Sequence, residues 1–272
     1  MDTYKKRKIW LAVLLSCLVP GLGQLYNGQS KKAISIYGVT IALGISLKIA
    51  FANFSTVAVW TCLIITLYLY VIIDAFYYAK TIKELALRPY NRWFIYLTIW
   101  ILSVAINSYV RAIPYKAYKV PAGSMIPSLQ IGDHFIIDTA YYRNHSLARG
   151  DIVVVLYPDD PTREFVKRVI GLPHDTVEIL NKQVIINGHP LQESYIQHIT
   201  EEIFPRTSSL RDNFGPIVVP SDSIFLLGDN RDSSLDSRFW KNTYAKIETI
   251  QGKALYIYWS KDLSRISKTF NL

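Results

Sequence analysis

Residues 151–170 read Asp-Ile-Val-Val-Val-Leu-Tyr-Pro-Asp-Asp-Pro-Thr-Arg-Glu-Phe-Val-Lys-Arg-Val-Ile. Two runs rich in β-branched and aromatic residues flank a turn with two prolines and two aspartates, which predicts a β-hairpin. Further runs of this kind, separated by turn residues, follow at 176–180, 184–186, 224–227 and 254–259. Because no stretch alternates strands with helices, as a parallel sheet requires, residues 113–272 are expected to form an antiparallel all-β domain, with a cap insertion over 176–222.

The first 112 residues have a different composition. Three segments are long and apolar enough to cross a bilayer, which takes about 20 residues: 33–54, 57–78 and 93–112. They are apolar on all sides, whereas helices of a soluble bundle would have polar faces. A fourth apolar stretch, 9–26, is broken by Pro20-Gly21-Leu22-Gly23 and is expected to be re-entrant or interfacial. The predicted fold class is a multi-span α-helical membrane anchor followed by an antiparallel all-β domain.

The net charge of +9 comes from 30 basic and 21 acidic residues. Basic clusters flank the apolar segments at 5–8, 31–32 and 80–92, while the loop around 53–56 is uncharged. Because basic clusters stay in the cytoplasm, we expect three spans and export of everything after Val110. The orientation of the protein in the membrane then explains why basic residues outnumber acidic ones. Nucleic-acid binding is therefore not expected. Lys48 and Asp74, each alone in a span, are expected to reach toward the interface rather than form an ion relay.

A serine in a constrained turn is the first candidate for chemistry. Ser124 follows Gly123 between two prolines, in a turn that can present backbone N–H groups to a developing oxyanion. On the predicted strand, Lys167 shares a face with Phe165 and Val169, which favours its desolvation. To act as a base, this lysine needs a pKa lowered from about 10.4 toward about 8.

A charged loop completes the candidate site. Residues 228–238 contain three aspartates and two arginines, a self-compensating set that favours ion pairing over metal binding. No paired histidine spacing is present, and the two cysteines lie in apolar segments, which excludes a disulfide framework.

These elements, in this order, resemble bacterial type I signal peptidases (leader peptidases), which are membrane-anchored Ser/Lys proteases. The resemblance is carried by Gly-Ser-Met-x-Pro, Arg-Gly-Asp-Ile-Val, Phe-Val-Lys-Arg-Val-Ile-Gly-Leu-Pro and Gly-Asp-Asn-Arg-Asp-x-Ser-x-Asp-Ser-Arg. It implies that Ser124 is the nucleophile and oxyanion donor, Lys167 the general base, Ser234 the residue that orients the lysine, and Met125 a membrane contact. Structural support is implied for Arg168, Asp229, Arg231, Asp232, Asp236 and Arg238, with Arg168 as a partner for one of the aspartates.

The resemblance implies cleavage of N-terminal signal peptides from exported preproteins, with small residues before the cut and with no metal or cofactor. The implied location is the bacterial cytoplasmic (inner) membrane. The protein would cross this membrane several times, with its catalytic domain on the extracytoplasmic side. Membrane lipid and the protein export machinery are the further partners expected. Two alternatives stay open: a specialised Ser/Lys peptidase for a narrow client such as a pilin or conjugation precursor, and a catalytically inactive assembly factor.

Three features depart from the family pattern: Ala122, His174, and Lys241-Asn242, which stands where a glycine often follows the charged loop. Ala122 stands where many members have a hydroxyl that helps to stabilise the oxyanion, and His174 replaces the usual glycine of a turn. The last stretch, Leu263–Leu272, is polar and basic and is expected to be a mobile tail.

Overall fold

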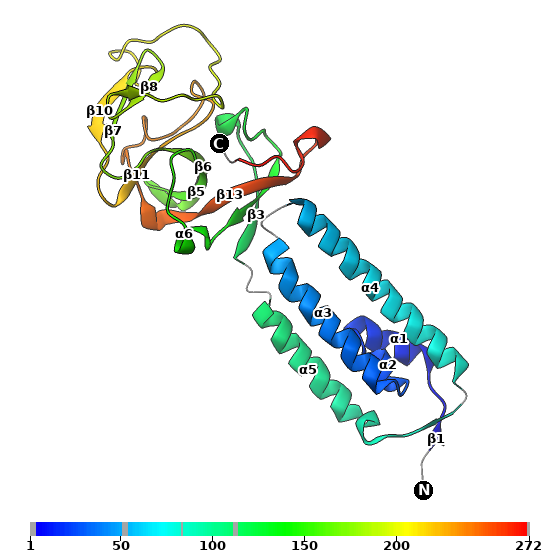
Figure 1. Ribbon diagram of the computed structural model, residues 1–272. Helices are drawn as coiled ribbons and strands as arrows, with labels where there is room; N and C mark the ends of the chain where they lie inside the picture. The colour runs from blue at the N-terminus through cyan, green and yellow to red at the C-terminus, as the bar shows by residue number, and fades with distance from the viewer. Residues whose placement is uncertain (1–3, 51–53, 83, 111–113, 271–272) are drawn as a thin grey trace. The chain divides into compact units, whose positions relative to one another are not determined.

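The computed structural model describes residues 4–50, 54–82, 84–110 and 114–270 (Figure 1). The chain divides into two compact units, Met1–Ile113 and Pro114–Leu272. The boundary between them lies one residue beyond the end of the predicted membrane domain, 1–112.

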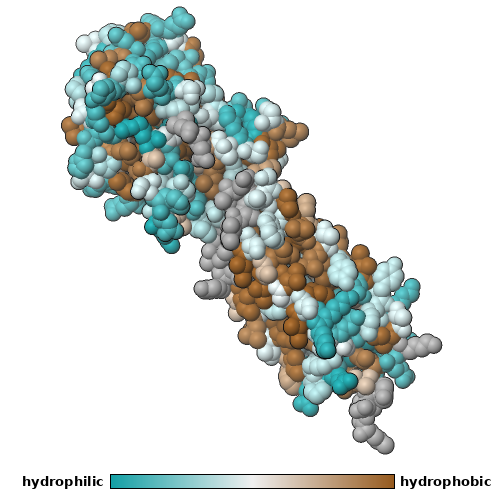
Figure 2. Space-filling view, viewed as in Figure 1, coloured by the Kyte–Doolittle hydropathy of each residue, from teal (hydrophilic) through white to brown (hydrophobic). Residues whose placement is uncertain are grey.

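The N-terminal unit is helical. Its elements are α1 (Ile9–Leu18), α2 (Leu22–Tyr26), α3 (Ser30–Ala50), α4 (Phe54–Thr81), α5 (Trp93–Val110), the strands β1 (Tyr4–Lys5) and β2 (Leu85–Ala86), and the 3-10 turn η1 (Pro89–Asn91). Among the described residues, one helix, α4, is long and apolar enough to cross a membrane; α1 and the first part of α5 (Trp93–Ile106) are apolar but shorter. The predicted spans 33–54 and 93–112 correspond to α3 and α5, and their crossing of a bilayer stays a prediction. Figure 2 shows apolar side chains over much of the surface of these helices.

The apolar stretch 9–26 forms two short helices rather than one. Helix α1 ends at Leu18, and α2 begins after Pro20-Gly21. Gly23 lets α2 pack closely, because a Cβ there would lie 2.0 Å from Ser16 Oγ and 2.3 Å from the Ala12 carbonyl oxygen. The break that the proline and glycines predict is present, while re-entrance itself remains a prediction.

Asp74 on α4 is paired within the N-terminal unit. Its carboxylate accepts hydrogen bonds from Lys32 Nζ at 2.6 Å and from Gln24 Nε2 at 3.1 Å. A carboxylate in apolar surroundings is stabilised by such a counter-charge. Asp74 is therefore paired rather than alone, and its reach toward the membrane interface stays a prediction. The side chain of Lys48 lies outside the described part of the chain.

The C-terminal unit contains two antiparallel sheets, which confirms the predicted all-β domain (Figure 1). The larger, in the order β12-β11-β6-β5-β13-β4-β3, is built from β3 (Tyr115–Lys119), β4 (His134–Asp138), β5 (Ile152–Tyr157), β6 (Asp160–Gly171), β11 (Ser223–Leu227), β12 (Ala245–Lys246) and β13 (Ile250–Trp259). The smaller, in the order β10-β7-β8-β9, is built from β7 (Thr176–Leu180), β8 (Gln183–Ile186), β9 (His189–Pro190) and β10 (Phe214–Val218). The predicted insertion 176–222 thus contains the whole smaller sheet.

The predicted hairpin forms strands β5 and β6. Val153 lies opposite Lys167, and Ile152 lies opposite Arg168, so successive residues of β6 point to opposite faces. Val154 packs in one buried cluster, while Val153 and Val169 pack in another. Both faces of this hairpin are therefore covered, which explains its nearly continuous apolar sequence.

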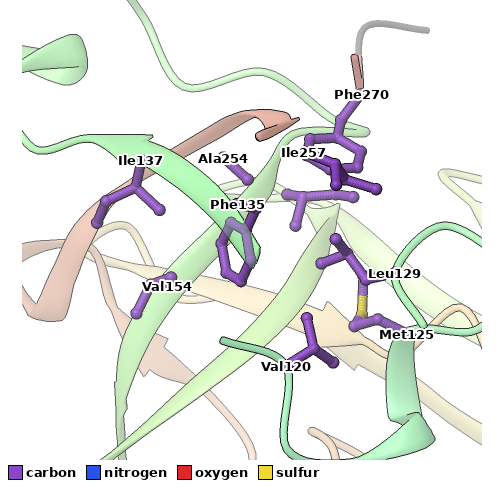
Figure 3. Packing of buried hydrophobic residues seen from close by; sticks show 10 residues of the cluster. Val120, Met125, Leu129, Phe135, Ile137, Val154, Ala254, Ile257 and Phe270 are labelled. Carbon is purple, nitrogen blue, oxygen red and sulfur yellow. The ribbon is translucent and has the colours of Figure 1, made fainter. Parts of the chain in front are cut away.

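Met125 lies inside the first of these clusters. Its side chain is 1% exposed and packs with Val120, Leu129 and Phe135 (Figure 3). The prediction that this side chain contacts the membrane is wrong, because the thioether fills the interior of the β domain instead.

The residues after Leu263 also pack against the β domain. Phe270 joins the cluster of Figure 3, and Arg265 forms an ion pair with Asp133 at 2.7 Å. Arg265 Nη2 also donates to the Ser128 carbonyl oxygen at 2.9 Å, four residues after the candidate nucleophile. The prediction of a mobile tail is therefore wrong for residues 263–270, since one buried aromatic and one buried arginine fix the segment.

His174 occupies a left-handed backbone conformation, with φ of 69°. Asn181, Lys182 and Asn187 in the turns of the smaller sheet also have positive φ values. Glycine adopts this region without a Cβ penalty, and asparagine tolerates it better than most residues. A glycine at position 174 would adopt this conformation without the Cβ penalty, whereas His174 adopts it at a cost.

Candidate active site

Ser124 lies in η2, the 3-10 turn Gly123–Met125. Asn230 holds this turn from the loop after β11: its backbone N–H donates to the Ser124 carbonyl oxygen at 3.1 Å, and its Nδ2 donates to the Gly123 carbonyl oxygen at 3.1 Å. Asn230 is 5% exposed. It lies in the motif that the sequence singled out, but the residue types alone gave it no role.

Lys167 reaches Ser124 from β6. Its Nζ donates to Ser124 Oγ at 3.0 Å and to the Val166 carbonyl oxygen at 3.0 Å, and it lies 5.1 Å from the centre of the Phe165 ring. The residue is 4% exposed. Burial lowers the pKa of Lys167 to about 8, against the opposing negative charges of Asp236 and Asp229. About a tenth of this amine is therefore neutral at pH 7, and a neutral amine can accept a proton.

Arg168, on the other face of β6, pairs with Asp229. Its Nε and Nη2 donate to the two carboxylate oxygens at 2.7 and 2.6 Å, and both side chains are almost completely buried. The guanidinium also donates to the Gly150 carbonyl oxygen at 2.7 Å and stacks on the Tyr195 ring at 3.8 Å. This bidentate pair ties the lysine strand to the loop that holds the serine turn.

Asp236 and Arg238 form a second buried pair. Arg238 Nε and Nη2 donate to Asp236 at 2.9 and 2.8 Å, and the Gly228 N–H donates to the same carboxylate at 3.1 Å. Although burial opposes ionisation, the charge and hydrogen bonds of Arg238 hold the pKa of Asp236 below its ordinary value. The negative charge therefore persists beneath Lys167 and limits how far the lysine pKa falls.

Arg231 and Asp232 connect this loop to the segment 191–213. Arg231 forms a buried bidentate pair with Glu193, with one bond at 2.9 Å from Nη1. Asp232 accepts the backbone N–H groups of Ile199 and Thr200 at 2.7 and 2.9 Å. Sequence reasoning missed Glu193, because 38 residues separate it from its partner and no local motif marks it.

Ser234 is buried beside the serine turn, but its Oγ has no hydrogen-bond partner among the described residues. Gly228 leaves it room: a Cβ at position 228 would lie 2.2 Å from Ser234 Oγ and 2.4 Å from the Ser124 carbonyl oxygen. The structure therefore brings Ser124 and Lys167 into contact and places Ser234 close to the turn without bonding it to the lysine.

A groove of about 640 Å³ opens over Ser124 and Lys167. Its lining includes the turn before the serine and residues of β6 and the 228–238 loop, namely Val120, Pro121, Ala122, Phe165, Val166 and Leu235. Glu164 at its edge accepts a hydrogen bond from the Tyr118 hydroxyl at 3.1 Å. In the described part of the chain, no three His, Cys, Asp or Glu side chains are grouped so that they could hold a metal ion.

The comparisons with known proteins identify the family of this chain. The family model described as "Signal peptidase, peptidase S26" matches residues 91–259. A signal peptidase I of Leptolyngbya laminosa is 36% identical over 166 residues, covering 58% of this chain and 75% of the relative. Signal peptidase I U of Bacillus subtilis (strain 168) is 33% identical over 165 residues, covering 59% and 87%.

A solved signal peptidase I from Enterococcus faecalis V583 has 29% sequence identity and a TM-score of 0.32, covering 40% of this chain and 97% of that one. The family model spans more than half of the chain and includes the serine turn, the lysine strand and the charged loop. By this match, the chain belongs to the signal peptidase family, peptidase S26.

Proposed function

We propose that Ser124 and Lys167 form the catalytic dyad with which this signal peptidase cleaves signal peptides from preproteins. Neutral Lys167 takes the proton from Ser124 Oγ as the oxygen attacks the scissile carbonyl carbon. The lysine then gives a proton to the leaving amine, and water hydrolyses the ester that remains on the serine. The observation that carries the proposal is the 3.0 Å contact between a serine hydroxyl and a buried lysine whose pKa is about 8.

The oxyanion of the tetrahedral intermediate requires a donor, and the proposed one is the backbone N–H of Ser124. Ala122 lines the groove and offers no hydroxyl to assist. A single oxyanion donor contributes about 10²–10³ in rate, so the fixed position of this turn matters. Asn230 bonds this turn directly, and Arg265 bonds the Ser128 carbonyl oxygen four residues after the serine.

The groove is the proposed binding site for the segment before the cut. An extended peptide can add to exposed backbone as a further strand, with alternate side chains entering the groove. Pro121, Ala122 and Val166 give it an apolar lining that suits small side chains at the first and third positions before the cut. Ser234, next to the turn, is the proposed group that orients the lysine during the reaction.

The membrane arrangement is proposed from charge. Three spans, α3, α4 and α5, with the basic clusters in the cytoplasm, place the β domain on the extracytoplasmic side. The stretch 9–26 then stays at the cytoplasmic side. Membrane lipid and the export machinery are the further proposed partners. A reporter enzyme that works only in the cytoplasm, fused after Leu272, should be inactive; an active fusion contradicts this topology.

The two alternatives make different predictions. An inactive assembly factor has no need of a buried lysine in contact with a serine, and this chain retains both residues. A specialised peptidase would share the dyad and differ in its clients. Cleavage of a panel of preproteins, including pilin-type precursors, separates a broad signal peptidase from a narrow one.

The direct test is cleavage of a preprotein in detergent by the wild type, Ser124→Ala and Lys167→Ala. Both variants should lose almost all activity. Ser208→Ala and Lys261→Ala, which change the same residue types at exposed positions, are matched controls and should cleave normally. Normal cleavage by either dyad variant contradicts the proposed mechanism.

A further inference from the structure

The charge of this protein is divided unequally between its two units. Residues 1–113 contain 12 Lys and Arg but only three Asp and Glu, whereas residues 114–272 contain 18 of each. The entire net charge of +9 therefore belongs to the N-terminal unit. Figure 2 shows hydrophilic side chains gathered at the end of the helices where the basic segments lie.

One of these basic residues differs from the rest. Lys5, Lys6 and Lys8 are exposed, but Arg7 is only 6% exposed. Its Nε and Nη2 are buried and donate no hydrogen bond to any described residue. A buried guanidinium without an acceptor is costly, so this position calls for an anion.

The surroundings of Arg7 hold it in place. Its guanidinium stacks on the Tyr26 ring, 4.4 Å from the ring centre, and the Tyr26 hydroxyl accepts the Lys8 N–H at 3.1 Å. Asn91 Nδ2 donates to the Tyr96 hydroxyl at 2.8 Å, and the Tyr96 ring lies 6.4 Å from that of Tyr26. The site is therefore built from three segments of the N-terminal unit and does not depend on a loose surface side chain.

No described carboxylate pairs with this guanidinium. The unit has three acidic residues: Asp74 is bound to Lys32 and Gln24, Glu84 is exposed and forms no ion pair with a described residue, and Asp2 lies outside the described residues. Two tryptophans, Trp10 at the start of α1 and Trp93 at the start of α5, are 62% and 74% exposed; they follow Arg7 by three residues and Asn91 by two in the sequence. Exposed tryptophans at the ends of apolar helices are typical of the membrane interface.

We propose that Arg7 binds the phosphate of an anionic phospholipid headgroup. The planar guanidinium matches a phosphate with two parallel hydrogen bonds, and the ring of Tyr26 orients it for that purpose. The exposed Lys5, Lys6 and Lys8 attract the same anion over a longer range, and the tryptophans place it at headgroup depth. Free phosphate has the same chemistry but no acyl chains to lie against the apolar helices. The inference rests on the membrane anchoring proposed above and is independent of the catalytic dyad.

The test uses the purified full chain in a neutral detergent, titrated with short-chain phosphatidylglycerol, with phosphatidylcholine or with inorganic phosphate. Thermal unfolding and native mass spectrometry report binding. The wild type and Lys261→Gln, which removes one positive charge from an exposed position of the β domain, should bind phosphatidylglycerol alike. Arg7→Gln should bind it about tenfold more weakly, the loss expected when hydrogen bonds to a charged group are removed.

Each other outcome has a clear meaning. Equal binding by Arg7→Gln and the wild type, or no preference of the wild type for phosphatidylglycerol, overturns the proposal. An equal effect of inorganic phosphate at the same concentration assigns the site to a free anion and overturns the lipid part. Arg7→Lys keeps the charge but loses the planar guanidinium, so it should also bind phosphatidylglycerol more weakly than the wild type. This variant replaces Arg7→Gln in the test if Arg7→Gln does not fold. Arg7→Gln should still cleave a preprotein in detergent, which separates a loss of lipid binding from a failure of the catalytic proposal. Extraction of the wild type from membranes by carbonate would contradict the membrane anchoring.

Discussion

Replacement of Lys167 by methionine should abolish cleavage and stabilise the protein. Folding buries this amine, and its pKa falls from the ordinary 10.5 to about 8. At pH 7 the charged form is favoured in the unfolded chain, so the lowered pKa costs the folded state about 3 kcal/mol, at about 1.4 kcal/mol for each pH unit. Methionine fills a similar volume without that cost.

The sign of the pH dependence follows from the lowered pKa of a base. The cost is fully present below pH 8 and disappears as the pH rises toward 10.5, where the unfolded chain also loses its proton. The melting temperature of Lys167→Met should therefore exceed that of the wild type by about 6–12 °C at pH 7. At pH 10 the remaining difference should correspond to about 1 kcal/mol.

The assay is thermal unfolding of the full chain in detergent at pH 7 and pH 10, followed through the β domain. Lys253→Met is the matched control: Lys253 is also largely buried but forms an ion pair with Asp151 at 2.7 Å, so its loss should destabilise. A Lys167→Met variant that is less stable than the wild type at pH 7, or whose difference does not change with pH, would refute the reasoning. In the wild type, cleavage should rise about tenfold between pH 7 and pH 9, because the neutral fraction of the lysine rises from about a tenth to about nine-tenths.

Three further substitutions test the support of the site. Glu193→Ala leaves Arg231 buried without its counter-charge and should cost about 3–5 kcal/mol in urea unfolding, whereas exposed Glu202→Ala should change little. Asn230→Ala releases the Gly123 carbonyl oxygen and should lower kcat about tenfold with KM nearly unchanged; a change in KM alone would contradict a role in positioning the serine. His174→Gly removes a side chain from a left-handed backbone and should raise the free energy of unfolding by about 1 kcal/mol, and a loss of stability would show that His174 makes compensating contacts.

The fold of the C-terminal unit was largely predictable, because its strands carry short, β-branched runs separated by turn residues. The hairpin 151–170 gave the register of Lys167 and Arg168 directly, since side chains alternate along a strand. Strand β3, with the sequence Tyr-Lys-Ala-Tyr-Lys, was not recognised, because it lies at the edge of the sheet and has few buried residues.

The errors at the site have a common cause. Met125 and Arg265 were interpreted from local composition, as a membrane contact and as part of a polar tail, but both are buried by residues far away in sequence. The pairing of Arg231 with Glu193 likewise depends on how the 191–213 segment folds back. Local patterns predict which residues alternate or turn, whereas long-range pairing of charges requires the tertiary structure.

Lys167 and Arg168 are neighbours on β6, point to opposite faces and differ in what their side chains can do. A slip of the strand by one position would exchange those faces and bring Arg168 toward Ser124. A guanidinium holds its proton at any pH the protein meets, so such a slipped enzyme would have a positive charge at the serine and no base. Insertions and deletions should therefore be tolerated in the connection between β5 and β6 but not within β6 itself, where a single added residue would silence the enzyme without altering either of its catalytic side chains.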